Sequence, residues 1–210
     1  VENGRVEDRD GFPLKAGLRE IAKAHDGVFR LTPNQHLVIN DVSEENKPVI
    51  QALMDEYGIS DQQTPSGLRR GAMACVGLGS CALANAESER YLPSLVTRLE
   101  PLLAAYGLTD DEIVMRMTGC PNGCGRPYLG EIGFVGKSLG RYNLYLGAGY
   151  VGDRLNKLHS ENVNEDEIVE ILDPMFAAYA SERESGERFG SFVIRKGYVK
   201  ATVEGKDFHA

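Results

Sequence analysis

The sequence lacks any long hydrophobic run: nowhere do about 18 apolar residues follow one another, as a membrane-spanning helix requires. Its first five residues lack the basic and then apolar pattern of a secretory signal. Positive charge is also scarce, because 23 Lys and Arg against 31 Asp and Glu give a net charge of −8. Non-specific binding to nucleic acid or to an acidic membrane needs a positive field. We therefore expect a cytoplasmic protein that binds neither nucleic acid nor membranes.

Cysteine is scarce as well, and four cysteines in 210 residues are too few for a disulfide scaffold. They form two close pairs: Cys75 and Cys81 stand in a C-x5-C spacing, and Cys120 and Cys124 in a C-x3-C spacing. Each pair lies in a glycine-rich stretch. The histidines are scattered and none is near a cysteine pair, so we interpret them as surface or packing residues: His25, His36, His159 and His209.

The spacing of apolar residues predicts an α+β fold with mixed α and β layers. Helices are predicted over residues 14–25, from 41–45 to about 58, over 82–106 with a break at Pro93 or Pro101, and over 164–184. Strands are predicted at residues 29–31, 37–39, 113–117, 131–135, 142–146, 192–194 and 198–199. The polar stretch 61–70 contains Pro65 and Gly67 and is predicted to be a linker. Two domains are therefore expected, residues 1–64 and 65–210.

The chemistry of the two cysteine loops favours an iron–sulfur cluster. Thiolates and inorganic sulfide carry negative charge, which backbone N–H groups stabilise when they turn inward. Glycine permits the close approach and the left-handed dihedrals that such turning needs. A helix beginning after Cys81 would add a favourable dipole. The glycines expected to serve in this way are Gly77, Gly79, Gly119, Gly123 and Gly125.

Three other interpretations of the cysteines remain open on spacing alone. Structural zinc sites often use four cysteines, but they favour spacings from C-x2-C to C-x4-C, which C-x5-C does not match. Buried inert thiols usually occur singly, and disulfides require an oxidising compartment, of which the sequence gives no sign.

At the level of motifs, the C-x5-C pair followed about 40 residues later by Thr-Gly-Cys-Pro-Asn-Gly-Cys-Gly-Arg resembles the signature of the nitrite and sulfite reductase haemoproteins. Further similar stretches are residues 31–35, 140–144 and 182–189. The resemblance extends over essentially all 210 residues, is greatest to the NADPH-dependent sulfite reductases, and covers the second half of that family's chain.

The resemblance implies a fold and a set of cofactors. It implies a nitrite/sulfite reductase ferredoxin-like half-domain over residues 1–64, followed by a sirohaem and [4Fe–4S] domain over 65–210. In that family four thiolates hold the cluster, and the last of them also ligates the sirohaem iron. By motif position the cluster ligands are Cys75, Cys81, Cys120 and Cys124, and Cys124 is the bridge to sirohaem.

The resemblance places two further residues near the sirohaem and gives two arginines a choice of roles. Asn122 and Gln35 match positions that the family places close to the macrocycle. Arg126 and Arg141 are basic and lie within the matching motifs, so contact with macrocycle carboxylates and a structural salt bridge are both expected roles.

The implied reaction is the six-electron reduction of sulfite to sulfide in sulfate assimilation and cysteine biosynthesis. The implied partners are an N-terminal half of the same subunit and an NADPH-dependent flavoprotein subunit. The alternatives are a ferredoxin-dependent sulfite reductase or an assimilatory nitrite reductase, a non-catalytic zinc module built on the four cysteines, and a cofactor-free chain with reduced thiols.

The sequence departs from the family pattern in two places. The family commonly has Pro-Thr-Cys-Pro at the second ligand, whereas this chain has Gly79-Ser80-Cys81-Ala82. The basic residues that bind the anionic substrate in the family belong to the N-terminal half. We therefore expect this chain by itself to fold, to retain little sirohaem and to turn over no sulfite.

Overall fold

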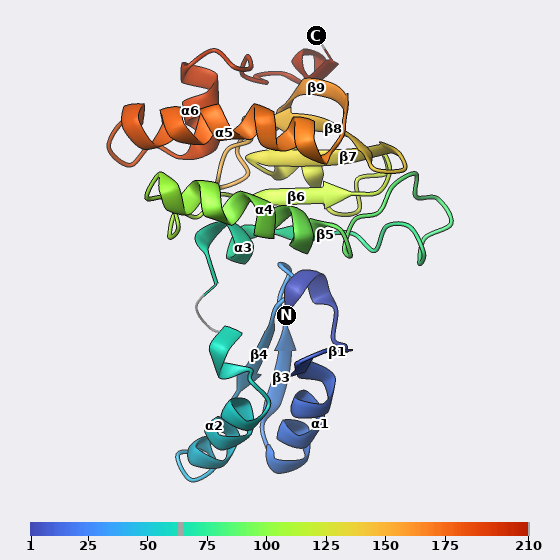
Figure 1. Cartoon of the computed structure of the whole chain (residues 1–210), viewed down its shortest axis with the longest axis vertical. Helices are drawn as coiled ribbons and strands as arrows, with labels where there is room; N and C mark the ends of the chain where they lie inside the picture. The colour runs from blue at the N-terminus through green and yellow to red at the C-terminus, as the bar shows by residue number, and fades with distance from the viewer. Residues whose placement is uncertain (63–64, 210) are drawn as a thin grey trace. The chain divides into compact units, whose positions relative to one another are not determined.

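The chain divides into two compact units, Val1–Pro65 and Ser66–Ala210. The computed structural model describes residues 1–62 and 65–209 (Figure 1). The division falls within the stretch predicted as a linker, of which residues 63 and 64 lie outside the described residues. The rest of that stretch is not all irregular, because Gly67–Gly71 forms the short helix α3. The helices and strands of the two units form the α+β fold that the sequence predicts.

The first unit packs two helices with two small antiparallel ribbons. Helix α1 packs against α2, and the apolar side chains Leu14, Ile21 and Ile50 are buried. The first unit's elements are η1 (Glu2–Gly4), β1 (Asp8–Arg9), β2 (Phe12–Pro13), α1 (Leu14–Ala24), β3 (Val28–Leu31), β4 (Leu37–Asn40), α2 (Lys47–Glu56) and η2 (Ser60–Gln62).

The predicted helix 14–25 and strands 29–31 and 37–39 are confirmed, and the strands pair as β3 and β4. Helix α2 begins at Lys47, later than the predicted 41–45. Its first turn contains Pro48, whose fixed φ suits that position and whose missing N–H costs nothing there.

A five-stranded mixed sheet forms the centre of the second unit, in the order β5-β6-β7-β8-β9. Strands β5, β6 and β7 run parallel, and β8 and β9 continue the sheet antiparallel. The bounds are β5 (Met73–Ala74), β6 (Met115–Thr118), β7 (Ile132–Ser138), β8 (Arg141–Leu146) and β9 (Lys157–Val163). The strands predicted at 113–117, 131–135 and 142–146 correspond to β6, β7 and β8.

Helices α4 (Leu92–Ala105) and α5 (Glu165–Glu182) lie side by side over one face of this sheet (Figure 1). Their apolar faces and the strands form one core with α6 (Phe189–Arg195). Asn164 and Glu167 form a capping box at the start of α5, where the sequence predicts the helix to begin. The break predicted at Pro101 does not occur: α4 continues through this residue, which lies on the exposed side of the helix. Among the described residues, no helix is both long enough and apolar enough to cross a membrane.

Three predictions about the second unit are wrong. The helix predicted over 82–106 begins only at Leu92, because residues 85 and 86 donate their backbone N–H groups to Gly119 O instead of to a helix. Residues 192–194 lie in helix α6, where Phe192 packs on Tyr179 of α5 at 5.3 Å between ring centroids. Residues 198–199 lie in no strand. Tertiary packing here overrides the β propensity of these apolar residues.

Strand β9 was not predicted from the sequence. It reads Lys-Leu-His-Ser-Glu-Asn-Val and is partly exposed along most of its length. It lies at the edge of the sheet, where burial does not impose the alternation of apolar residues by which strands are recognised.

Candidate metal centre

Strands β5 and β6 place the two cysteine pairs at the same edge of the sheet. Cys75 directly follows β5, and Cys120 comes two residues after the end of β6. The strands are parallel, with Ala74 opposite Met117, and the Cys75 N–H continues the ladder to Met117 O at 3.1 Å. The carboxyl ends of adjacent parallel strands meet at one edge, and both loops leave the sheet there (Figure 1).

Hydrogen bonds join the two loops directly. The Gly119 N–H donates to Cys75 Sγ at 3.2 Å, and the Thr118 hydroxyl lies 3.5 Å from the same sulfur. In the opposite direction, the N–H groups of Asn85 and Ala86 donate to Gly119 O at 2.8 and 3.0 Å. The stretch that carries Cys120 thus supplies donors to the sulfur of Cys75, and the stretch after Cys81 binds the backbone beside Cys120.

The glycines of the loops have the conformations that the sequence predicts. A Cβ at Gly119 would lie 2.6 Å from Ala86 O, so only glycine permits the hydrogen bonds between the loops. Gly77 has φ +63°, and a Cβ there would lie 2.5 Å from Ser88 N. Of the other three loop glycines, Gly79 and Gly123 have positive φ, and Gly125 lies so close to Met117 O that a Cβ would not fit.

The four cysteines are free thiols with different exposure. Cys120 is buried, Cys75 and Cys81 are partly buried, and Cys124 is exposed. Within residues 1–62 and 65–209, no three His, Cys, Asp or Glu side chains gather closely enough to hold one metal ion. The structure therefore brings the two loops together without drawing the four sulfurs around one point. No helix begins after Cys81: residues 82–91 form turns, and the predicted dipole at that cysteine is absent.

The donor set of these loops fits an iron–sulfur cluster. Four thiols in two adjacent loops are the ligand number of a [4Fe–4S] cluster. A backbone N–H and a hydroxyl already point at the sulfur of Cys75, which is how proteins stabilise cluster thiolates. Ligand number and hydrogen bonding thus agree, and the residues that would hold the cluster are those that the motif indicates.

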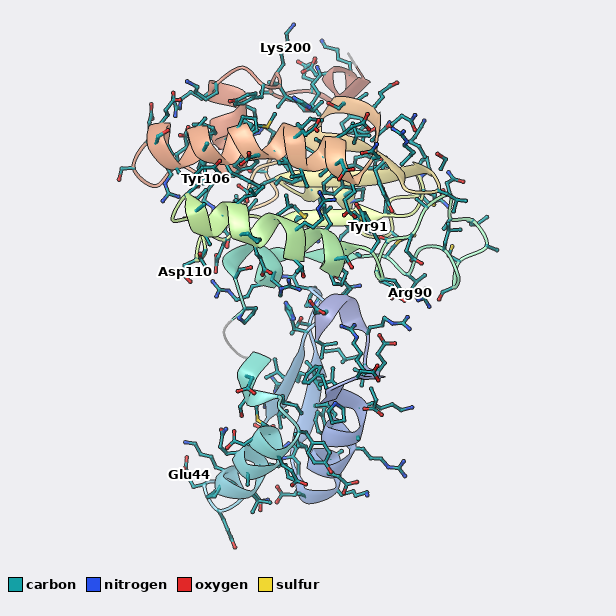
Figure 2. All side chains as sticks on the ribbon, viewed as in Figure 1. Glu44, Arg90, Tyr91, Tyr106, Asp110 and Lys200 are labelled. Carbon is teal, nitrogen blue, oxygen red and sulfur yellow. The ribbon has the colours of Figure 1, made fainter. Side chains whose placement is uncertain are left out.

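Positive side chains lie beside the cysteine loops. Arg116 Nη1 and Arg126 Nη2 both contact Met73 Sδ, at 3.4 and 3.3 Å. Burial lowers the pKa of Arg116, and the charge of Arg126 acts in the same direction. Arg90, labelled in Figure 2, donates to Leu78 O in the first loop at 2.9 Å. Arg90 and Arg126 thus place positive charge beside the two loops.

Sequence reasoning did not identify Arg116 as a residue near the site. The available signal is the alternation of β6, which places Arg116 on the same face as Thr118 and opposite the buried Met117.

The other residues that the resemblance indicates lie in different surroundings. Asn122 is exposed in the second cysteine loop. Gln35 belongs to the first unit, in the turn between β3 and β4, where it has φ +64° and donates its N–H to Thr32 O at 3.0 Å. Arg141 forms a salt bridge at 2.9 Å with Glu167, the capping residue of α5.

Comparison with known proteins gives one consistent result. Residues 1–57 match the family described as the nitrite/sulfite reductase ferredoxin-like half domain. The chain is 55% identical over 208 residues to the sulfite reductase (NADPH) hemoprotein beta-component of Staphylococcus carnosus, and 58% identical over 209 residues to that of a Paenibacillus species. Its fold is similar to that of the Mycobacterium tuberculosis NirA protein, with a TM-score of 0.69 and 28% identity over 87% of this chain and 35% of that one.

The matches to the hemoprotein beta-components cover 99% and 100% of this chain but only 37% and 36% of the relatives. The chain thus spans little more than a third of the length of these curated relatives. The identity extends over both units, and the family match covers most of the first. Over its whole length the chain is thus similar to part of the sulfite reductase hemoprotein beta-components, and its first 57 residues match the nitrite and sulfite reductase family.

Proposed function

We propose that this chain is the cluster-binding part of a sulfite reductase haemoprotein, an enzyme that reduces sulfite to sulfide with six electrons. One observation carries the proposal: two hydrogen-bonded cysteine loops lie at adjacent strand ends, in a chain 55–58% identical to hemoprotein beta-components. The residues that would hold a [4Fe–4S] cluster are Cys75, Cys81, Cys120 and Cys124, and Cys124 would also bind the sirohaem iron.

When bound, the cluster and the sirohaem supply the electron transfer and the iron at which sulfite reacts. The chain's own residues hold and tune the ligands. The Gly119 N–H and the Thr118 hydroxyl orient the Cys75 sulfur and stabilise its negative charge. The exposure of Cys124 leaves its sulfur accessible from outside the loop, as a ligand shared by two centres requires.

A buried phenol, that of Tyr142, and a partly buried one, that of Tyr128, border the proposed ligands. Burial raises the pKa of Tyr142, whose hydroxyl donates to Glu87 O at 2.7 Å and whose ring stacks on Tyr91 at 5.3 Å. Burial also raises the pKa of Tyr128, and the nearby Tyr145 and Cys120 add to that effect. Both phenols therefore stay neutral near pH 7 and add no charge to the site.

The domain roles and the partners are part of the same proposal. We infer that residues 1–64 serve as a ferredoxin-like half-domain and residues 65–210 as the cluster and sirohaem domain, with Asn122, Gln35 and Arg126 near the macrocycle. The greater length of the relatives supports a further part of the same subunit that completes the sirohaem pocket and binds sulfite. An NADPH-dependent flavoprotein subunit is the proposed electron donor, in the cytoplasm.

Anaerobic reconstitution of the chain with iron and sulfide tests the ligand set. We expect about four iron and four sulfide per chain, together with an EPR signal on reduction. Cys120→Ser should lose most of this iron, while Ser80→Ala, a neighbour of Cys81 that is no proposed ligand, should keep it. One zinc without sulfide would support a structural zinc module instead, and a metal-free chain would also contradict the proposal.

A further inference from the structure

A single buried asparagine holds the backbone that follows the second cysteine pair. Asn156 is fully buried, with 0% of its surface exposed. Its Nδ2 donates to Pro127 O at 2.8 Å and to Gly130 O at 2.9 Å, and its backbone N–H donates to Tyr128 O at 3.0 Å. The 3-10 turn η3 (Pro127–Leu129) begins three residues after Cys124. One residue thus binds three carbonyl groups in and directly after this turn, those of Pro127, Tyr128 and Gly130.

These contacts depend on the two donors of one amide. Asparagine carries two N–H donors on a planar group, whereas aspartate of the same shape carries none when ionised. The Oδ1 atom of Asn156 is buried and has no hydrogen-bond partner within the described residues. A buried, unsatisfied acceptor costs stability. The side chain is therefore explained by what it donates to η3.

The surroundings of Asn156 are shaped to admit it. A Cβ at Gly133 would lie 2.6 Å from Asn156 Nδ2 and 2.3 Å from Pro127 O, so glycine in β7 leaves the space for this contact. The Thr202 hydroxyl donates to Asn156 O at 3.3 Å. The ring of Tyr128 in η3 packs on Tyr145, with 5.3 Å between the centroids. Segments from β7, β8 and the C-terminal region thus converge on the turn.

The second cysteine loop is consequently fixed on both sides. Before Cys120, Gly119 O accepts two N–H groups from the first loop. After Cys124, Asn156 fixes Pro127 and Gly130. The loop between these anchors is largely exposed and has no helix or strand of its own. We propose that Asn156 is a positioning residue that sets the place of Cys120 and Cys124, and thereby the geometry of the cluster. The effect on the cluster rests on the proposed function, whereas the effect on the loop does not.

Hydrogen exchange of the chain without cofactors tests the effect on the loop. In Asn156→Ala the amides of Leu129 and Gly130, which bond to Arg126 O and Pro127 O, should exchange at least about tenfold faster. The amides of Asn85 and Ala86, on the other anchor, should keep their rates. Asn143→Ala is the matched control, because it also removes a buried amide, one that accepts the Asn162 N–H away from the cysteines.

Two results of the exchange experiment would overturn the proposal. One is an unchanged exchange rate at Leu129 and Gly130. The other is an equal rise in rate at these amides and at Asn85 and Ala86, in Asn143→Ala as well as in Asn156→Ala. If Asn156→Ala does not fold, Asn156→Ser replaces it, since its shorter side chain cannot reach both carbonyl groups and the same amides are compared.

The midpoint potential and the EPR spectrum of the reconstituted cluster test the effect on the cluster, because a loss of protein stability alone changes neither. Asn156→Ala should shift the midpoint potential of the cluster and change its EPR line shape, whereas Asn143→Ala should match the wild-type chain in both. A wild-type spectrum and potential in Asn156→Ala would overturn the positioning role. A wild-type chain that binds no cluster would instead contradict the proposed function, and the exchange experiment would still decide whether Asn156 fixes the loop.

Discussion

At the scale of single residues, the second unit contains buried polar groups whose partners are backbone or sulfur atoms. Thr118 is fully buried, and its hydroxyl lies 3.5 Å from Cys75 Sγ. Glu131 is equally buried, and its two carboxylate oxygens accept the N–H groups of Val114 and Gly190, each at 2.9 Å. Removing such groups changes a specific contact without opening a large cavity, so each supports a sharp prediction.

Thr118→Val should lower the midpoint potential of the reconstituted cluster. Valine keeps the shape of threonine but removes the hydroxyl beside the Cys75 sulfur. Hydrogen bonds to cluster sulfur stabilise the more negative reduced state, so their loss makes reduction harder. An EPR-monitored redox titration measures the potential. Ser181→Ala is the control, since that hydroxyl donates to Ala177 O in α5, away from the cysteine loops. An unchanged or higher potential in Thr118→Val would contradict the prediction.

Glu131→Gln should flatten the pH dependence of stability. Burial raises the pKa of the Glu131 carboxyl above its ordinary value of 4.5, so above pH 4.5 the folded chain holds this proton longer than the unfolded chain. The stability that protonated Glu131 contributes is therefore present at low pH and lost as pH rises through the raised pKa. Glutamine does not titrate and removes this decline.

Urea unfolding of both proteins from pH 4.5 upward measures this effect of Glu131. Glutamine also turns an N–H group toward one of the two backbone donors. The variant should therefore be less stable than the wild-type chain, by about 1–3 kcal/mol at the acid end of this range, where the contribution of Glu131 is greatest. Glu161→Gln, at an exposed position of β9, is the control. The same slope in Glu131→Gln as in the wild-type chain would refute the assignment.

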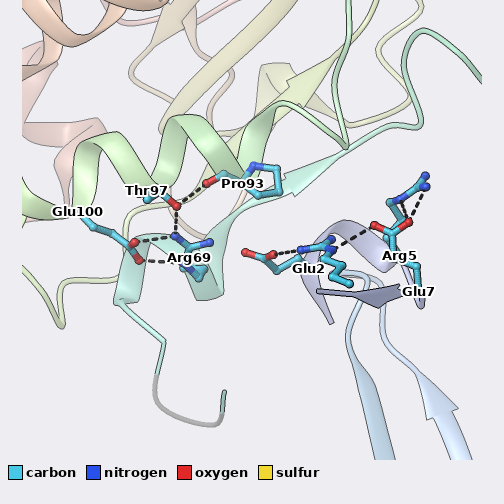
Figure 3. A network of polar contacts seen from close by, with 8 residues as sticks. Glu2, Arg5, Glu7, Arg69, Pro93, Thr97 and Glu100 are labelled. Carbon is cyan, nitrogen blue, oxygen red and sulfur yellow. Dashed lines mark hydrogen bonds and ion pairs between the residues drawn. The ribbon is translucent and has the colours of Figure 1, made fainter. Parts of the chain in front are cut away.

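At the scale of elements, one polar network attaches the short helix α3 to α4 (Figure 3). Arg69 forms two parallel hydrogen bonds with the Glu100 carboxylate, at 2.9 and 2.6 Å, and a third with Thr97 Oγ1 at 2.9 Å. Ser66, the cap of α3, donates to the same carboxylate at 2.7 Å. Because α3 leads directly into β5, the network fixes the start of the strand that carries Cys75.

Glu100→Gln should destabilise the chain at neutral pH by about 1 kcal/mol or less, since the pair is only partly buried. The hydrogen bonds from Arg69 hold the pKa of Glu100 below its usual 4.5. Its contribution is therefore present above pH 4.5 and is lost as pH falls through the lowered pKa.

Urea unfolding of Glu100→Gln and of the wild-type chain at pH 7 and at pH 3 should show that the difference in stability between them shrinks in acid. Glu204→Gln, which breaks the exposed pair with Lys206, is the control and should have no measurable effect. A difference that persists or grows in acid would contradict this account.

At the scale of the whole molecule, the chain has two compact units, each with buried apolar side chains, and 36–37% of the length of its curated relatives. The second unit holds the larger core and all four cysteines. In the family that the chain resembles, the basic residues that bind sulfite belong to the other half. Cluster binding and substrate binding are thus expected from different parts of the protein.

The 210-residue chain by itself should therefore produce no sulfide from sulfite with reduced methyl viologen, even after its cluster is reconstituted. Production of sulfide is measured directly, with a full-length hemoprotein beta-component as the positive control. Turnover by the chain alone, lost in Cys124→Ser, would show that the substrate site lies within these residues.

The residues alone were enough to predict the cysteine motif and the elements whose signal is local. Helix α5 was predicted from its capping residues and apolar stripe, and β7 and β8 from their alternation around Gly140. The glycines of the cysteine loops were also predicted correctly, because backbone positions with left-handed dihedrals or close neighbours rarely accept any other residue. The family resemblance followed from the two cysteine motifs.

The remaining features could not be predicted from local sequence, because the contacts responsible join residues far apart in the chain. Residues 82–91 form no helix because Gly119 O takes the N–H groups of residues 85 and 86. Residues 192–194 form a helix because Phe192 packs on α5. Asn156 looks like an ordinary loop residue until the fold brings it within 3 Å of Pro127 O and Gly130 O. Local propensity does not encode such partners, since each depends on packing that forms only when the whole unit folds.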